Sequence, residues 1–143
     1  MRRIPVFRKL TCLALLPLAA CTGLTAGPEV SAVTPVPASK DSAWVRTKRA
    51  LTTEVFTLDV QDSLGGRLTA MRYPSATAKP GTAAACRVGL ALAIEGSADH
   101  ASLASTSRWL APEVTSATNA QVCEQDRQET LDRILQVVAP AAN

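Results

Sequence analysis

The amino-acid sequence predicts an α+β domain over residues 41–143, with an N-terminal helix, a four-stranded antiparallel sheet and a C-terminal helix packed on one sheet face. Three observations favour this fold class. Both ends of the range have apolar side chains at helical spacing, four segments between them alternate apolar and polar side chains, and two cysteines fall on predicted apolar faces. About 100 residues suffice for one domain with a modest core.

The two helices are predicted from apolar spacing and end signals. The first spans residues 41–54, with Asp41 as N-cap and a narrow stripe at Trp44, Lys48, Leu51 and Val55. The second spans residues 119–138, where Thr118 begins a capping box and Pro140 follows the end. Its apolar side consists of Cys123, Thr130, Leu131, Ile134, Val137 and Val138.

Four strands are predicted between the helices. Residues 55–60 and 67–73 alternate apolar and polar side chains around a glycine-containing turn, which is typical of a hairpin. After a loop at residues 74–85, residues 86–95 place long aliphatic side chains on one face and mainly small ones on the other. This pattern indicates an inner strand whose heavy face packs against helices. Residues 101–110 return as the fourth strand.

The N-terminus has the layout of a secretory signal peptide. Arg2 and Arg3 precede an apolar run over residues 10–20, which ends in small side chains. The run has 11 residues and contains Pro17, whereas a membrane-spanning helix needs about 20 apolar residues. We therefore expect the segment to be removed rather than to span a membrane.

The end of this run, Leu18-Ala19-Ala20-Cys21, resembles the lipobox of bacterial lipoproteins. The resemblance implies that residues 1–20 are a lipoprotein signal peptide, that Cys21 carries a diacylglyceryl group, and that the new amino terminus receives an acyl chain such as palmitate. Thr22 implies, by the same resemblance, anchoring in the outer membrane on its periplasmic face, or in the cell membrane outside Gram-negative bacteria. An ordinary signal peptide cut after Ala20 is the alternative.

Residues 21–40 are predicted to be the lipidated cysteine and a flexible tether. Residues 22–40 contain three prolines, two glycines and no aromatic side chain, a composition that buries too little apolar surface to fold. Such a coil would extend about 25 Å on average and would hold the domain away from the membrane.

The net positive charge of the chain is a property of the signal peptide. Four of the 15 Lys+Arg residues leave with it, which leaves 11 against 12 Asp+Glu and a net charge of −1 for the mature chain. Nucleic-acid binding depends on a positive surface, so no nucleic-acid partner is expected.

The four cysteines have different predicted fates. Cys12 leaves with the signal peptide and Cys21 is the lipidation site, so Cys86 and Cys123 remain. In an oxidising envelope compartment, two remaining thiols on apolar faces are predicted to form a structural disulfide. Reactive thiols are the less favoured alternative, because the spacing is not CxxC.

The sequence offers little for catalysis or metal binding. The single histidine, His100, lies in the turn "GSADH", and no GxSxG motif is present. The carboxylates of "CEQDRQETLD" are typical of a solvated helix face. We therefore expect no catalytic residues, no metal site and no cofactor.

Two groups of residues are candidates for partner binding. Arg46, Lys48 and Arg49 form a basic cluster on the first helix, and Arg108 with Trp109 belongs to residue types enriched at interfaces. The alternatives are a solvated helix face for the basic cluster and core packing for Trp109.

The segments "AWVRTKRAL", "FTLDV" and "GGRLTA" also resemble modules of the BamC/NlpB-type accessory lipoproteins of outer-membrane assembly. The first functional hypothesis is a non-enzymatic accessory or interaction lipoprotein with an envelope protein as partner, because an anchor and a tether are joined to a domain with few catalytic groups. The alternative is a lipoprotein that carries a small ligand or lipid in an apolar groove. An enzyme is the least favoured class.

Overall fold

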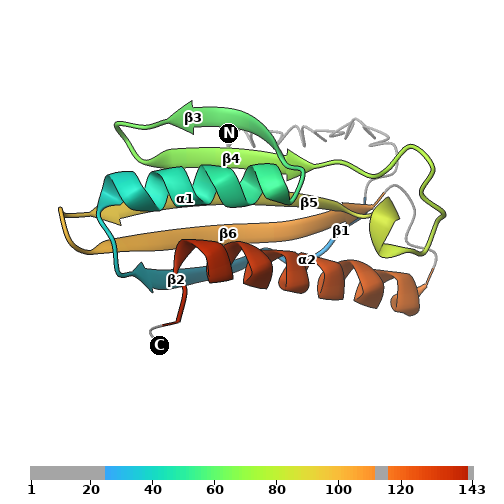
Figure 1. Cartoon of the computed structure of the whole chain (residues 1–143). Coiled ribbons are helices and arrows are strands. Elements are labelled where there is room, and N and C mark those ends of the chain that lie inside the picture. Colours follow the sequence, from blue (N-terminus) through green and yellow to red (C-terminus); the bar gives the residue numbers. More distant parts are fainter. Residues whose placement is uncertain (1–24, 112–115, 142–143) are drawn as a thin grey trace, which may run out of the picture.

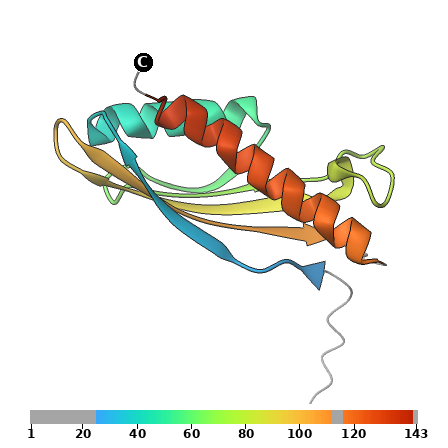
Figure 2. The same cartoon turned by 90° about the horizontal axis from the view of Figure 1, so that it is seen from below.

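The computed structural model describes residues 25–111 and 116–141 of the chain. In chain order the elements are β1 (Thr25–Ala26), β2 (Val30–Val36), α1 (Lys40–Thr53), β3 (Thr57–Asp62), β4 (Arg67–Arg72), the 3-10 helix η1 (Ala83–Ala85), β5 (Arg87–Gly96), β6 (Ala101–Ala111) and α2 (Ala117–Val138). All six strands form one antiparallel sheet, and both α-helices lie on the same face of it (Figures 1 and 2).

The strand order is β1-β6-β5-β4-β3, and β2 also pairs with β6. The two N-terminal strands therefore lie one after the other along the same edge of β6. Thr25 of β1 is opposite Ala111, whereas Val36 at the end of β2 is opposite Ala101. The N-terminal segment thus follows β6 over nearly its whole length.

The prediction of a four-stranded sheet that begins with a helix is wrong. Within the part of the chain that the structure describes, the sheet has six strands, and α1 follows two of them. Both additional strands come from the segment predicted to be a tether. β2 is held in the sheet by its backbone pairing with β6 and by hydroxyl side chains of β6. The Ser105 and Ser107 hydroxyls donate to the carbonyls of Ala32 and Val30 at 3.4 and 3.5 Å. Composition alone does not reveal such pairing.

Both α-helices begin at serine caps. Ser39 Oγ accepts a hydrogen bond from the Ser42 amide at 3.2 Å, and Ser116 Oγ accepts one from the Asn119 amide at 3.2 Å. The predicted caps Asp41 and Thr118 lie inside the helices instead. Each helix therefore starts one or two residues earlier than its sequence pattern indicates.

The main core lies between the sheet and the helices, at α1 and the C-terminal half of α2. Alternate residues of β5, from Val88 to Ile94, face the helices, and Leu51, Ile134 and Val138 pack against them. A second, smaller cluster consists of Cys86, Trp109, Ala111 and Cys123. It lies toward the N-terminal end of α2.

Candidate functional site

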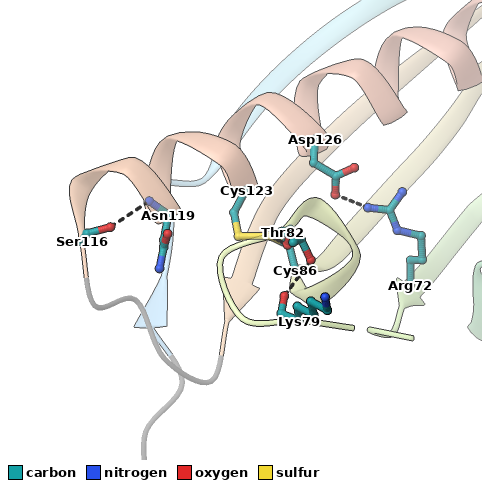
Figure 3. Close-up of a disulfide and its surroundings, with 8 residues drawn as sticks. All are labelled: Arg72, Lys79, Thr82, Cys86, Ser116, Asn119, Cys123 and Asp126. Carbon is teal, nitrogen blue, oxygen red and sulfur yellow. Dashed lines mark hydrogen bonds and ion pairs between the residues drawn. A yellow bond between two sulfur atoms is a disulfide. The ribbon is translucent and has the colours of Figure 1, made fainter. Parts of the chain in front are cut away.

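The loop of residues 74–85 is held against α2 at this second cluster. Cys86 and Cys123 form a disulfide, with their Cα atoms 5.5 Å apart, and so join the start of β5 to the helix (Figure 3). This is the pairing that the sequence predicts. The bridge fixes one end of the loop on the helix surface.

Hydrogen bonds within the loop give it a defined shape. The Ser75 amide donates to the Ala84 carbonyl at 3.2 Å and closes the base of the loop. The Thr82 hydroxyl donates to the Lys79 carbonyl at 2.7 Å (Figure 3). The loop is therefore an ordered wall for whatever lies between it and α2.

A glycine provides the second contact between loop and helix. Gly81 has a positive φ of 80°, and a Cβ built there would lie 2.9 Å from Asn119 Oδ1. A side chain at this position would therefore be strained and would push against the first turn of α2. The loop and helix meet at Gly81 and again at the disulfide.

A pocket of about 400 Å³ lies between these two contacts, and we call it the disulfide pocket. This volume falls within the range of about 300–1,000 Å³ that is usual for small-molecule sites. Its walls are mainly apolar, and the described residues that line it include no Asp, Glu, Lys, Arg or His. They consist of Pro74, Ser75, Ala78, Pro80, Gly81, Thr82, Ala85, Cys86, Ala111, Asn119 and Cys123.

A charged groove of about 520 Å³ lies on the other side of Cys86. Arg72 forms an ion pair there with Asp126 (Figure 3). Its guanidinium also donates to the Thr130 hydroxyl at 2.8 Å. The side chains of Arg72 and Asp126 are only 17% and 13% exposed. The groove therefore contains fixed, paired charges rather than free ones.

Burial raises the pKa of Asp126 above the ordinary aspartate value of 3.8, although the facing Arg72 acts to lower it. In the native state Asp126 thus binds its proton more tightly than in the unfolded chain. The contribution of the Asp126 carboxyl to the free energy of unfolding is therefore fully present at low pH. It is lost as pH rises through the window between 3.8 and the raised native pKa.

We therefore predict a pH-dependent difference between the native chain and Asp126→Asn. The free energy of unfolding of the native chain relative to the variant should fall as pH rises from about 3 to 6, because only the native chain must ionise a buried carboxyl. Urea unfolding of both proteins across this range measures the difference. A difference that grows with pH would mean that the attraction to Arg72 outweighs burial.

A second buried charge was not expected from the sequence. Arg127, only 4% exposed, donates to Ser107 Oγ at 2.9 Å and pairs with Glu124 on the same helix. The sequence pattern indicates a solvated helix face here, and Arg127 departs from it. Ser105 and Ser107 could have indicated a buried polar partner such as Arg127. Both lie on the side of β6 that faces the helices, and buried hydroxyls need polar partners.

The structure separates the predicted partner-binding residues. Arg46 turns toward the end of α2 and donates to the Val138 carbonyl at 3.4 Å, whereas Arg49 is exposed and Lys48 half-buried. Arg108 is exposed on the sheet face that has no helices, while Trp109 is buried on the opposite face at 4% exposure. These side chains do not form one surface, and Cys21 lies outside the described residues.

Within residues 25–111 and 116–141, His100 is an exposed residue between β5 and β6, and no group of three or more His, Cys, Asp or Glu side chains is placed to hold a metal ion. The same residues include no helix with the length and apolarity needed to cross a membrane.

The fold defines a class of protein in which one antiparallel sheet carries two α-helices on one face, with an apolar pocket beside the C-terminal helix. No protein-family model and no curated protein sequence matches the chain. Among solved structures, Ara h 8.0201 is similar over 81% of this chain and 96% of its own, with a TM-score of 0.55 and 7% identity. TTHA0849 from Thermus thermophilus covers 78% of this chain and 94% of its own, with a TM-score of 0.44 and 12% identity. The likeness to Ara h 8.0201 concerns the fold alone.

Proposed function

We propose that this chain is a lipid-anchored, non-enzymatic protein of the bacterial envelope that binds a small apolar ligand in the disulfide pocket. The lipobox-like sequence ending at Cys21 supports the anchor. The apolar pocket next to the disulfide is the observation that carries the binding function. Its walls offer shape and apolar surface, and their polar groups are hydroxyl, amide and backbone groups that orient a ligand rather than react with it.

Filling the pocket should weaken binding strongly. Ala78 is half-buried and lines the pocket, whereas Ala76 belongs to the same loop but is exposed and does not line it. We expect Ala78→Phe to weaken binding of the fluorescent apolar probe anilinonaphthalene sulfonate about tenfold or more, because the new ring occupies the ligand volume. The matched variant Ala76→Phe should bind like the native chain. Equal binding by both variants would show that the probe binds elsewhere.

The anchor has its own test. The intact mass of protein purified from its native membrane should correspond to residues 21–143 plus a diacylglyceryl group and an acyl chain. A mass without lipid would remove the anchor from the proposal and leave the pocket untouched.

A second candidate function is the capture of an extended segment of an envelope protein by β2. The β3 edge is interrupted by a bulge between Leu58 and Val60 and carries Asp59 and Asp62, features that discourage further strand pairing. By contrast, β2 has no charged residue, and Val33 is 71% exposed. Pro35 discourages pairing near the end of the strand, so residues 30–34 are the part of this edge that can accept an added strand.

We therefore expect a photo-crosslinker at Val33 to give a discrete adduct in intact cells. The same group at Val60, which is 50% exposed on the opposite edge, is the matched control. Identical adduct patterns at the two positions would exclude a specific role for β2.

A further inference from the structure

We propose that the occupant of the disulfide pocket is an acyl chain of a phospholipid from the bilayer in which the protein is anchored. This inference rests on the proposed function, since it requires both the lipid on Cys21 and an apolar ligand in the pocket. It adds the chemical class of the ligand and the source from which it comes.

Few residues separate the anchor from the folded domain. The sheet begins at Thr25, four residues after Cys21. A fully extended chain spans at most about 3.3–3.6 Å per residue, so Thr25 lies within roughly 14 Å of the anchored cysteine. A tether of 19 residues, as the composition predicts, would have allowed the domain to move away from the bilayer. The strands β1 and β2 remove most of that length.

The pocket lies at the end of the sheet that is nearest to the anchor in the chain. Thr25 pairs with Ala111, and Ala111 is one wall of the disulfide pocket. Figure 2 shows β1, the beginning of α2 and the 74–85 loop at the same end of the molecule. The short link to Cys21 therefore holds this end of the domain, and with it the pocket, next to the membrane surface.

The chemistry of this end suits a lipid. The pocket walls that the structure describes have no charged side chain, which suits a hydrocarbon chain. The 74–85 loop has a single ionisable residue, Lys79, whose side chain is exposed. A lysine close to a bilayer is attracted to the phosphate groups of anionic lipids. An apolar pocket flanked by one cation fits the acyl chain and phosphate of one lipid molecule.

The two tryptophans provide a test. Trp109 belongs to the cluster that includes the pocket residues Ala111, Cys86 and Cys123. Trp44 lies near the start of α1, where the Lys40 amide donates to Ser97 between β5 and β6, at the opposite end of the sheet. Fluorescence from the Trp44→Phe variant therefore reports on the pocket end, and fluorescence from Trp109→Phe reports on the far end.

The experiment uses the full lipidated protein in vesicles of phosphatidylethanolamine and phosphatidylglycerol, with brominated or ordinary acyl chains. Bromine quenches a nearby indole, so we expect brominated vesicles to lower the emission of Trp44→Phe. Adding Ala78→Phe should restore this emission, whereas adding Ala76→Phe should not. Trp44 emission in Trp109→Phe should be the same in both vesicles.

Each other outcome overturns the inference in a distinguishable way. Quenching that persists with Ala78→Phe would show that the end of the domain lies near the bilayer without lipid in the pocket. Binding of anilinonaphthalene sulfonate without quenching by brominated vesicles would mean that the pocket binds a ligand other than bilayer lipid, and the proposed function would stand. If a correctly lipidated protein showed neither anilinonaphthalene sulfonate binding nor quenching, the proposed function would be overturned as well.

Discussion

Removal of the Cys86–Cys123 disulfide is expected to lower the free energy of unfolding by about 4 kcal/mol, the chain-entropy value for a loop closed over 37 residues. The bridge limits the conformations of the unfolded chain, and in the native state it ties β5 to α2. A typical domain has a total stability of roughly 5–15 kcal/mol, so this loss should be visible as a large shift in the unfolding midpoint.

Urea unfolding of the native chain with and without reductant, and of the Cys86→Ser/Cys123→Ser double variant, measures the effect. Reductant should destabilise the native chain and leave the double variant unchanged. A loss below about 1 kcal/mol would mean that the unfolded chain retains structure around the two cysteines or that the bridge strains the native state.

The same change should affect the pocket. Both half-cystines are walls of the disulfide pocket, and Gly81 also lies close to Asn119 of the helix. Without the bridge the loop is held less firmly, so the double variant should bind the apolar probe more weakly than the native chain even where both are fully folded. Stability and binding are therefore linked through one covalent bond.

The inner strands could be predicted from the sequence because their side chains alternate strongly. In β5 the four residues Val88, Leu90, Leu92 and Ile94 are all buried on the helix side, as the pattern indicates. The disulfide was predictable for the same reason, since Cys86 and Cys123 continue the apolar faces of a strand and a helix. Both predictions rest on residues whose burial is decided by local periodicity.

The edge strand β2 and the pocket were not predictable in this way. β2 has a proline and small side chains, and the structure places it through backbone pairing with a distant segment, for example Val33 opposite Ala104. The pocket depends on how the 74–85 loop packs on α2, which requires Gly81 and Asn119 to meet. Such features arise from contacts between segments, and the composition of either segment alone does not contain them.

Gly27→Ala is expected to lower the free energy of unfolding by about 1–3 kcal/mol, the usual range for overpacking. A Cβ at residue 27 would lie 2.0 Å from Trp109 Nε1 and 2.3 Å from the next ring atom, so either the indole or the chain between β1 and β2 must move. The Gly27 amide also donates to the Trp109 carbonyl at 2.9 Å, and this bond would be lost if the chain moves. Hydration of the Trp109 N–H, which has no hydrogen-bond partner within the described residues, would offset part of the loss.

Gly89→Ala is the matched control, because the nearest atom to a Cβ there is the flexible Met71 Cε at an ordinary 3.4 Å. We expect its stability to stay within about 0.5 kcal/mol of the native value. In Gly27→Ala, but not in Gly89→Ala, Trp109 fluorescence should shift to longer wavelength as the indole meets water.

Equal stability of the two variants would show that the segment before β2 is not packed on Trp109. The link from Cys21 to the sheet would then be longer than four residues, and the domain would no longer be held next to the membrane. One glycine therefore tests both the packing of the N-terminal segment and the orientation that the lipid-binding proposal requires.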